Sequence, residues 1–309
     1  MENNSGIVIL GVPRSGTTLV RRLVNAHPNI ACPGETCILS ACARFMHSET
    51  VADGLEFGVI TGLSFAGFSQ DEILHRLRNF AFGFHTDHAQ SQGKKRWAEK
   101  TAVDIFHLDG IEDLCADQVQ YVCVVRHGLD VICSLKEFSD RGFTYLSEVH
   151  EYIKRYPIVL EAFAHAWVDS NQSLLRFIDR HPDNTHVIRY EDLVDNPETE
   201  TKKMFEFLNE QIDENIISTA LARPRKTGLG DWKTYQRDNI DKASIGRWKG
   251  LPQYLASRLA EICNPTLESF GYETILVKPR DKQSVARRRY EMAMNFNSSK
   301  DNGSAGNLS

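Results

Sequence analysis

The sequence predicts an α/β protein in which helices flank a mostly parallel central sheet. Three observations lead to this fold class: short apolar runs recur along the chain, segments with helical spacing follow them, and a glycine-rich turn separates the first pair. Buried strands that alternate with helices pair in parallel, because each helix carries the chain back across the sheet. The 309 residues allow one large domain or two small ones, and 41% of them are hydrophobic, which is ample for a core.

The first strand and helix follow from the N-terminal sequence. Ile7 to Leu10 is a short β-branched run that ends at a glycine, which is typical of a buried strand. In the segment from Thr17 to Ala26, Leu19, Leu23 and Val24 are spaced for one apolar helical face. We expect this strand and this helix to form the first crossover unit of the sheet.

The later elements repeat this alternation. We expect strands at 120–125 and 186–189 and helices at 129–138, 160–179 and 198–208. Asn196 and Pro197 mark the start of the last helix, because proline is favoured at a first helical position. Arg14, Arg126 and Tyr190 lie at or just after strand ends, where open parallel sheets bind ligands. These three side chains are therefore expected to converge on one site.

We expect one folded domain over residues 1–280 and a polar tail over 281–309. From residue 281 the sequence is first basic and then rich in Asn, Ser and Gly, a composition that disfavours a packed core. The tail is expected to be largely disordered, with room for a short helix over 284–294.

Composition narrows the classes of function. A net charge of −5 gives no support to general nucleic-acid binding. The seven cysteines show no zinc-type spacing, so free thiols and no metal site are expected. The N-terminus has no signal-peptide pattern, and the longest uncharged apolar stretch, at 57–69, is too short to span a bilayer. A cytoplasmic protein is therefore expected.

GVPRSGTTL, residues 11–19, has the glycine spacing of a phosphate-binding loop but lacks the lysine that usually follows the second glycine. Backbone N–H groups, the helix N-terminus and the hydroxyls of Ser15, Thr17 and Thr18 favour an anion at this turn. Without the lysine, the loop suits a shorter anion than a nucleoside triphosphate. No acidic residue lies between Glu2 and Glu35, whereas that stretch holds three arginines, Arg14, Arg21 and Arg22. The alternative is a plain strand-to-helix turn.

Four motifs in order resemble sulfotransferases that use 3′-phosphoadenylyl sulfate (PAPS). PRSGTTLVRRLVNAHPNI resembles their 5′-phosphosulfate loop, and VVRHGLDVICSL resembles their second signature, an arginine after a strand and a serine eight residues on. VIRYEDLVDNPE and SIGRWKGLP resemble the later strand-plus-helix and the closing segment. The resemblance covers residues 6–275 and implies a P-loop-like fold. It further implies that the nucleotide is held by Arg14, Ser15, Gly16, Thr17, Thr18, Arg126, Ser134, Tyr190 and Arg247.

Within that set, the resemblance implies that Arg126 and Ser134 bind the 3′-phosphate. This phosphate distinguishes PAPS from ordinary ADP or AMP. A bidentate arginine and a hydroxyl suit a dianionic phosphate. RKTGLGDWK, residues 225–233, is close to the RKGxxGDWK loop of cytosolic members, with Thr227 in place of the first glycine.

The catalytic residues implied by the resemblance are Glu35, Lys100 and Arg14. HPNIACPGETCIL is similar to the protein-tyrosine branch of the family, whose base aligns with Glu35, and Lys100 would stabilise the bridging oxygen. Glu35 could instead be a helix-entry acid, because a helix dipole favours carboxylates there. His107 is the alternative base, and His27 is expected to be structural because it ends a helix before proline. His47, His85 and His88 are expected on the surface or on a substrate loop.

The predicted activity is transfer of a sulfuryl group from PAPS to a hydroxyl, or less readily an amine, of a small-molecule acceptor, without a metal. The phenylalanines between residues 45 and 84 could line an acceptor pocket or form core. Two alternatives remain: a P-loop small-molecule kinase that uses ATP and magnesium, and a non-catalytic nucleotide-binding regulator. The missing lysine and the pair Arg126 and Ser134 disfavour the kinase, and an intact Glu35 and Lys100 disfavour the regulator.

Overall fold

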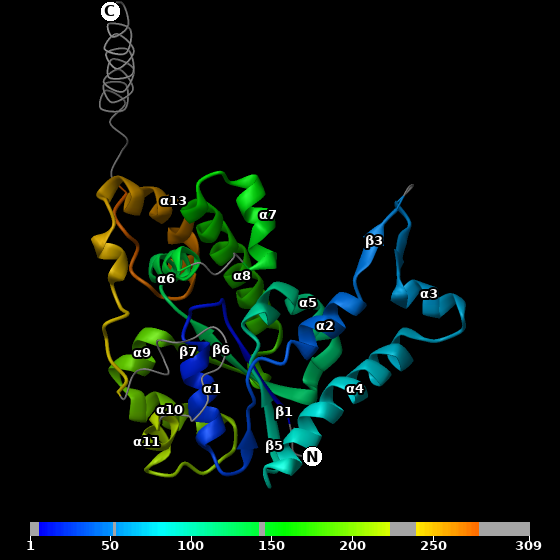
Figure 1. Ribbon diagram of the computed structural model, residues 1–309. Coiled ribbons are helices and arrows are strands. Elements are labelled where there is room, and N and C mark those ends of the chain that lie inside the picture. The colour runs from blue at the N-terminus through cyan, green and yellow to red at the C-terminus, as the bar shows by residue number, and fades with distance from the viewer. Residues whose placement is uncertain (1–5, 52–53, 142–145, 223–238, 278–309) are drawn as a thin grey trace, which may run out of the picture.

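A five-stranded parallel sheet forms the centre of the molecule (Figure 1). The computed structural model describes residues 6–51, 54–141, 146–222 and 239–277. Along the sheet the strands lie in the order β2 (Ile30–Ala31), β5 (Arg96–Glu99), β1 (Gly6–Leu10), β6 (Val119–Val125) and β7 (Thr185–Arg189). Each neighbouring pair is parallel. The predicted α/β class with a mostly parallel sheet is therefore confirmed.

Alternate residues of the central strands face two different hydrophobic cores. Val8 and Leu10 of β1 face one core, whereas Ile7 and Ile9 face the other. This is the two-residue period of a strand whose two sides are both buried. It explains why β1 and β6 consist almost wholly of apolar residues.

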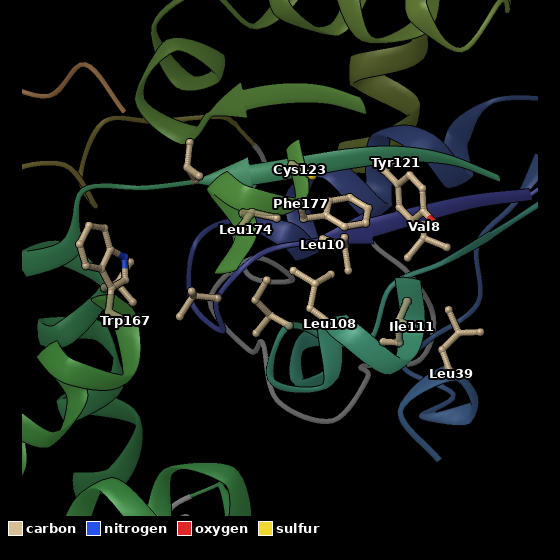
Figure 2. Packing of buried hydrophobic residues seen from close by; sticks show 14 of the residues in the cluster. Val8, Leu10, Leu39, Leu108, Ile111, Tyr121, Cys123, Trp167, Leu174 and Phe177 are labelled. Atoms are coloured by element: carbon tan, nitrogen blue, oxygen red, sulfur yellow. The ribbon is translucent and has the colours of Figure 1, made fainter. Parts of the chain in front are cut away.

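The face of the sheet that carries Ile7 and Ile9 is the first face. It is covered by four helices: α1 (Thr17–Ala26), α9 (Tyr190–Asp195), α10 (Pro197–Phe207) and α11 (Ile216–Leu221). The second face packs against α2 (Ile38–Phe45), α5 (Leu108–Cys115), α6 (Gly128–Asp140), α8 (Val159–Arg180) and α13 (Gln253–Ser269). Figure 2 shows this second core, where the Phe177 ring packs edge-on against Tyr121 of β6 at 4.8 Å between ring centres. Large buried rings of this kind supply much of the hydrophobic stabilisation.

Residues 48–51 and 54–91 belong to an arm that extends from the body (Figure 1). It contains the antiparallel pair β3 (Ser48–Thr50) and β4 (Glu56–Gly58), then α3 (Val59–Phe65) and α4 (Gln70–Ser91). Ser69 caps α4 in a reciprocal capping box with Glu72, which fixes where this helix begins. The C-terminal half of α4 returns to the body and contacts β5 and α5.

The remaining elements are helix α7 (Ser147–Arg155) and the short 3-10 turns at Ala102–His107, Ala116–Gln118, Pro182–Asn184 and Arg247–Gly250. Within the described ranges, no helix has the length and apolar character needed to cross a membrane.

The expected helices and strands agree with the structure to within about two residues, the usual uncertainty of helix boundaries. For example, α1 covers the expected span, and α10 begins at Pro197. No local pattern in the sequence predicted β2, β5 or the arm. The RKTGLGDWK segment and the polar tail over 281–309 lie outside the described residues.

Candidate active site

The loop between β1 and α1 is a tight turn with two residues in the left-handed region. Ser15 N–H donates to the Val12 carbonyl at 3.0 Å, and Arg14 and Gly16 have φ angles of 75° and 98°. Gly16 is the N-cap of α1, so the N–H groups of the first helical turn lie next to this loop. Such a helix start attracts anions.

Gly16 is also required by a close neighbour. The ring of Tyr190, the first residue of α9, lies against it, and a Cβ at position 16 would be 2.3 Å from Tyr190 Cδ2. The Arg126 guanidinium stacks on the same ring, with Cζ 4.6 Å from its centre. The ends of β1, β6 and β7 thus bring the three predicted side chains together, as expected from the strand ends.

Two arginines connect this loop to α6 and to residues 244–252 (SIGRWKGLP), here called the closing segment. Arg14 Nε donates to Ser134 Oγ of α6 at 3.2 Å. Arg126 donates through Nη1 to the Arg14 carbonyl at 2.9 Å and through Nη2 to the Ser244 carbonyl at 2.5 Å. Arg126 is 5% exposed, and its Nε is buried without a hydrogen-bond partner in the described structure.

The closing segment is held on α6 by polar contacts. Asp130 accepts hydrogen bonds from the N–H groups of Gly246 at 2.7 Å and Trp248 at 3.1 Å. Arg247 Nη2 pairs with Glu137 Oε2 at 2.7 Å, one turn along α6 from Ser134. Arg247 therefore lies near the predicted nucleotide residues, with a carboxylate as its present partner.

A pocket with an empty volume of about 580 Å³, partly open to solvent, lies at the mouth of the loop. Its walls come from the loop, from α6 and from the two segments that follow β2 and β5. The lining residues are Pro13, Arg14, Gly16, Thr17, Thr18, Glu35, Ala102, Val103, Leu135, Phe138 and Leu146. The predicted phosphate loop and the predicted base therefore share one cavity.

Glu35 and Lys100 form an ion pair at this pocket. Lys100 directly follows β5 and is 3% exposed, whereas the Glu35 side chain is 39% exposed. Burial of an ammonium group is costly unless a counter-charge accompanies it. Lys100 is therefore held at the edge of this pocket by its contact with Glu35 and is shielded from solvent.

Glu99, directly before Lys100 in the chain, is a fully buried carboxyl group that was not predicted from the sequence. It accepts a hydrogen bond from Thr101 Oγ1 at 2.5 Å, and Thr101 Oγ1 in turn accepts one from Cys37 N–H at 3.0 Å. Cys37 has a φ of 58° and precedes α2, so this contact holds the turn after Glu35 in a strained conformation. The sequence feature that could have revealed this residue is an acidic side chain at the end of the strand segment RWAE, directly before Lys100.

Burial raises the pKa of Glu99, although hydrogen bonds from Thr101 and Thr36 oppose this. Asp104 is also fully buried. Burial, together with the neighbouring Glu99, raises the pKa of Asp104 well above its usual range. Two carboxyl groups with raised pKa values thus lie behind the exposed Glu35, which is typical of functional sites.

His85 was expected on the surface or on a substrate loop, and that prediction is wrong because the residue is buried within helix α4. It is 2% exposed, stacks on Trp97 with ring centres 4.9 Å apart, and has Nε2 3.4 Å from Glu99 Oε2. Burial lowers the pKa of His85 to about 4, with a further contribution from His88. His85 is buried because it lies on the face of α4 that packs on β5.

The other histidines lie away from the loop pocket. His107 lies in a separate pocket with Arg44 and His47, and burial lowers its pKa. His27 is buried, with Nε2 2.9 Å from the Gln211 carbonyl, in accordance with the expected structural role. Among the residues that the structure describes, no cluster of three or more His, Cys, Asp or Glu side chains could hold a metal ion.

Two of the three N-terminal arginines contact backbone carbonyls. Arg22 Nε donates to the Ala220 carbonyl at 2.7 Å, and Arg21 Nη1 donates to the Cys32 carbonyl at 3.1 Å. These contacts stabilise the packing of α1 on α11 and on the segment after β2. Of the three, Arg14 is the one that lines the pocket.

Solved structures with a similar fold are sulfotransferase domains. The domain from the Synechococcus PCC 7002 olefin synthase gives a TM-score of 0.60 at 23% identity, covering 88% of this chain and 97% of that one. The domain from the curacin biosynthetic pathway gives 0.56 at 20% identity, covering 87% and 98%. These matches confirm the expected P-loop-like sulfotransferase fold.

Sequence relatives lead to the family. The family model described as sulfotransferase family matches residues 6–214. The nodulation protein NoeE of Sinorhizobium fredii (strain NBRC 101917 / NGR234) is 24% identical over 301 residues, 90% of this chain and 68% of NoeE. A putative protein-tyrosine sulfotransferase of Caenorhabditis briggsae is 22% identical, covering 88% of this chain and 91% of the relative. This chain belongs to the sulfotransferase family.

The tight turn at Gly16 gives a prediction about stability. Gly16→Ala should lower the free energy of unfolding by about 1–3 kcal/mol, because alanine is strained at this φ and its Cβ would overlap the Tyr190 ring. Urea unfolding followed by circular dichroism measures the change. Gly83→Ala is the matched control: its Cβ would meet nothing within 4 Å, so it should stabilise α4 by about 0.5–1 kcal/mol. Equal effects of the two substitutions would contradict this account of Gly16.

The buried His85 gives a prediction about pH. Its pKa is lower in the folded state, about 4 against 6.5, so the unfolded chain binds more protons between these values. Stability from this group should be fully present above pH 6.5 and should fall by about 3 kcal/mol as the pH drops to about 4. His85→Gln lacks this titration. The stability difference between wild type and variant, measured by urea unfolding across this range, should therefore change by that amount, and a difference independent of pH would refute the assignment.

Proposed function

We propose that this protein transfers a sulfuryl group from PAPS to a hydroxyl group of a small-molecule acceptor. The observation that carries the proposal is one cavity lined both by the loop after β1 and by Glu35, which pairs with the buried Lys100. Beside it lies the group formed by Arg126, Ser134 and Tyr190. Family membership supports sulfuryl transfer, and the chemistry of these side chains supports the donor.

The loop suits the 5′-phosphosulfate, and Arg126 with Ser134 suits the 3′-phosphate. Arg126 is a buried cation whose Nε has no hydrogen-bond partner in the described structure, which favours an anionic ligand at this position. Ser134 already joins this group to the loop through Arg14. An arginine carries several N–H donors, and the ion pair with Glu137 leaves Arg247 able to contact the nucleotide as well.

Transfer requires a base, an attacking oxygen and a stabilised leaving group. In the proposed reaction Glu35 takes the proton of the acceptor hydroxyl. The hydroxyl oxygen forms a bond to sulfur while the bond from sulfur to the phosphate oxygen of PAPS breaks. The products are the sulfated acceptor and 3′,5′-ADP, and the proton remains on Glu35.

The contact between Lys100 and Glu35 would couple removal of the acceptor proton to stabilisation of the leaving phosphate. As Glu35 gains a proton it loses its negative charge, and Lys100 loses its counter-ion. At the same stage negative charge develops on the leaving phosphate oxygen, where Lys100 and Arg14 would stabilise it. A buried ammonium is effective here, because electrostatic interactions are stronger away from water.

The proposed 3′-phosphate contact predicts a selective loss of affinity. Wild type should bind 3′,5′-ADP far more tightly than ADP or AMP. Arg126→Ala should weaken 3′,5′-ADP binding by about 1.5–3 kcal/mol, because a charge-assisted hydrogen bond is lost. Isothermal titration calorimetry gives the affinities, with 5′-AMP as the second ligand.

Arg126 also holds two backbone carbonyls, so the comparison between ligands is essential. An equal loss for 3′,5′-ADP and 5′-AMP would mean that Arg126 only supports the loop. Arg180→Ala, an exposed arginine paired with Glu112, is a control that should change neither affinity. Tight binding of ATP with magnesium by the wild type would favour a kinase instead.

The proposed base predicts a loss of turnover without a loss of binding. Glu35→Gln keeps the shape of the side chain but cannot accept the proton, so kcat should fall by about 10²–10⁴. Release of 3′,5′-ADP from PAPS with a panel of phenols and alcohols measures kcat, and calorimetry measures nucleotide affinity. The loss should shrink for acceptors of lower pKa, since these need less help from a base.

His107→Ala is the matched control for the base, because His107 lies in a separate pocket. It should leave kcat within about tenfold of wild type. If His107→Ala abolished turnover and Glu35→Gln cost only a few-fold, the histidine would be the base.

A further inference from the structure

A second, larger hollow lies beside Glu35, between α2 and α4. Its empty volume is about 1060 Å³, including space that is open to solvent. The lining residues are Pro33, Thr36, Cys37, Ile38, Ala41, Arg44, Phe80, Phe84, His85 and His88. We call this hollow the α2–α4 groove.

The walls of the α2–α4 groove are two helical stripes. Ile38 and Ala41 lie three residues apart on α2, and Phe80 and Phe84 lie four residues apart on α4, so each pair shares one helix face. Phe80 and Phe84 pack edge to face with ring centres 5.2 Å apart, yet remain 57% and 59% exposed. Large apolar side chains that gather in a hollow at the surface mark a site for an apolar ligand.

One end of the groove lies next to the proposed base. Thr36 and Cys37 line it and directly follow Glu35 in the chain. The hydrogen bond from Cys37 N–H to Thr101, beside Lys100, fixes that end relative to the ion pair. A molecule in the groove would therefore have one end within the same small region as Glu35.

The charge of the lining restricts the occupant. The groove is lined by one arginine and two histidines, and no aspartate or glutamate is among its lining residues. Burial keeps one of these histidines, His85, neutral at pH 7 by lowering its pKa to about 4. Arg44 disfavours a cationic ligand body along the wall of the groove, and Glu35 lies only at the Thr36 end, so a neutral or anionic body is favoured.

We infer that the α2–α4 groove binds the body of the acceptor, and that the acceptor is a neutral or anionic phenol or alcohol with an extended apolar part. This inference rests on the proposed function and adds the substrate class to it. The apolar body would lie between Ile38 and Ala41 on one side and the two phenylalanines on the other. Its hydroxyl would lie at the Thr36 end, towards Glu35.

The test uses 2-naphthol as the probe, with the full chain and saturating 3′,5′-ADP. Equilibrium dialysis should show 2-naphthol binding to the wild type. The double substitution Phe80→Ser and Phe84→Ser should weaken that binding about tenfold, because the apolar contact area is lost. Both side chains are more than half exposed, so the variant should fold, and an unchanged 3′,5′-ADP affinity would verify this.

Phe65→Ser is the matched control. Phe65 is 80% exposed and does not line the groove, so its loss should leave 2-naphthol affinity unchanged. Turnover adds a second arm: the wild type should transfer radiolabelled sulfate from PAPS to 2-naphthol, with a raised KM in the double variant.

Three results would overturn the inference. In the first, the wild type binds 3′,5′-ADP but not 2-naphthol. In the second, Phe65→Ser weakens 2-naphthol binding as much as the double substitution. In the third, the wild type sulfates a peptide with a tyrosine among acidic residues but not 2-naphthol. Absence of 3′,5′-ADP binding by the wild type is a separate result, because it would remove the proposed function itself.

Discussion

The burial of Lys100 is the constraint on which the site depends. An ammonium group with 3% exposure needs a negative partner, and the structure supplies Glu35 from a segment 65 residues earlier in the chain. That requirement keeps the turn before α2 against the end of β5. Glu99 and Thr101 hold the same turn in place, because Thr101 donates a hydrogen bond to Glu99 and accepts one from the Cys37 N–H group. The pocket has a defined shape because these charges and hydrogen bonds must be satisfied together.

The parallel sheet explains why distant segments meet at this junction. All five strands run in one direction, so the loops after β1, β5, β6 and β7 leave the sheet at one edge. Each loop contributes a different chemical group: the N-terminus of α1 after β1, an ammonium after β5, a guanidinium after β6 and an aromatic ring after β7. The two cores below hold the strands, while the loops are free to carry polar groups.

The part of the site that follows from local patterns could be predicted from the sequence. A turn such as GVPRSGTTL specifies its own backbone, because a glycine must occupy position 16 where φ is 98°. β1 and β6 are runs of apolar residues, since both of their faces are buried, and such runs are visible without a structure. The positions of Arg14, Arg126 and Tyr190 after their strands followed from the same argument.

What could not be predicted depends on contacts between segments far apart in the chain. β5 reads RWAE, with charges at both ends, and is a strand only because it lies between β2 and β1. The burial of His85 comes from the packing of α4 on that strand, and nothing in the local sequence of α4 distinguishes the buried His85 from the partly buried His88. The α2–α4 groove likewise exists only once two separate helices are side by side.

The two hydrogen bonds from Arg126 to the carbonyls of Arg14 and Ser244 have a consequence for the energetics of ligand capture. They join the loop between β1 and α1 to the segment at residues 244–252 through contacts within the protein itself. The conformational entropy of bringing these segments together is then lost during folding, and a ligand need not lose it again on association. For the proposed nucleotide, such pre-ordered segments favour tight binding from relatively few contacts, at the expense of adaptability towards ligands of a different shape.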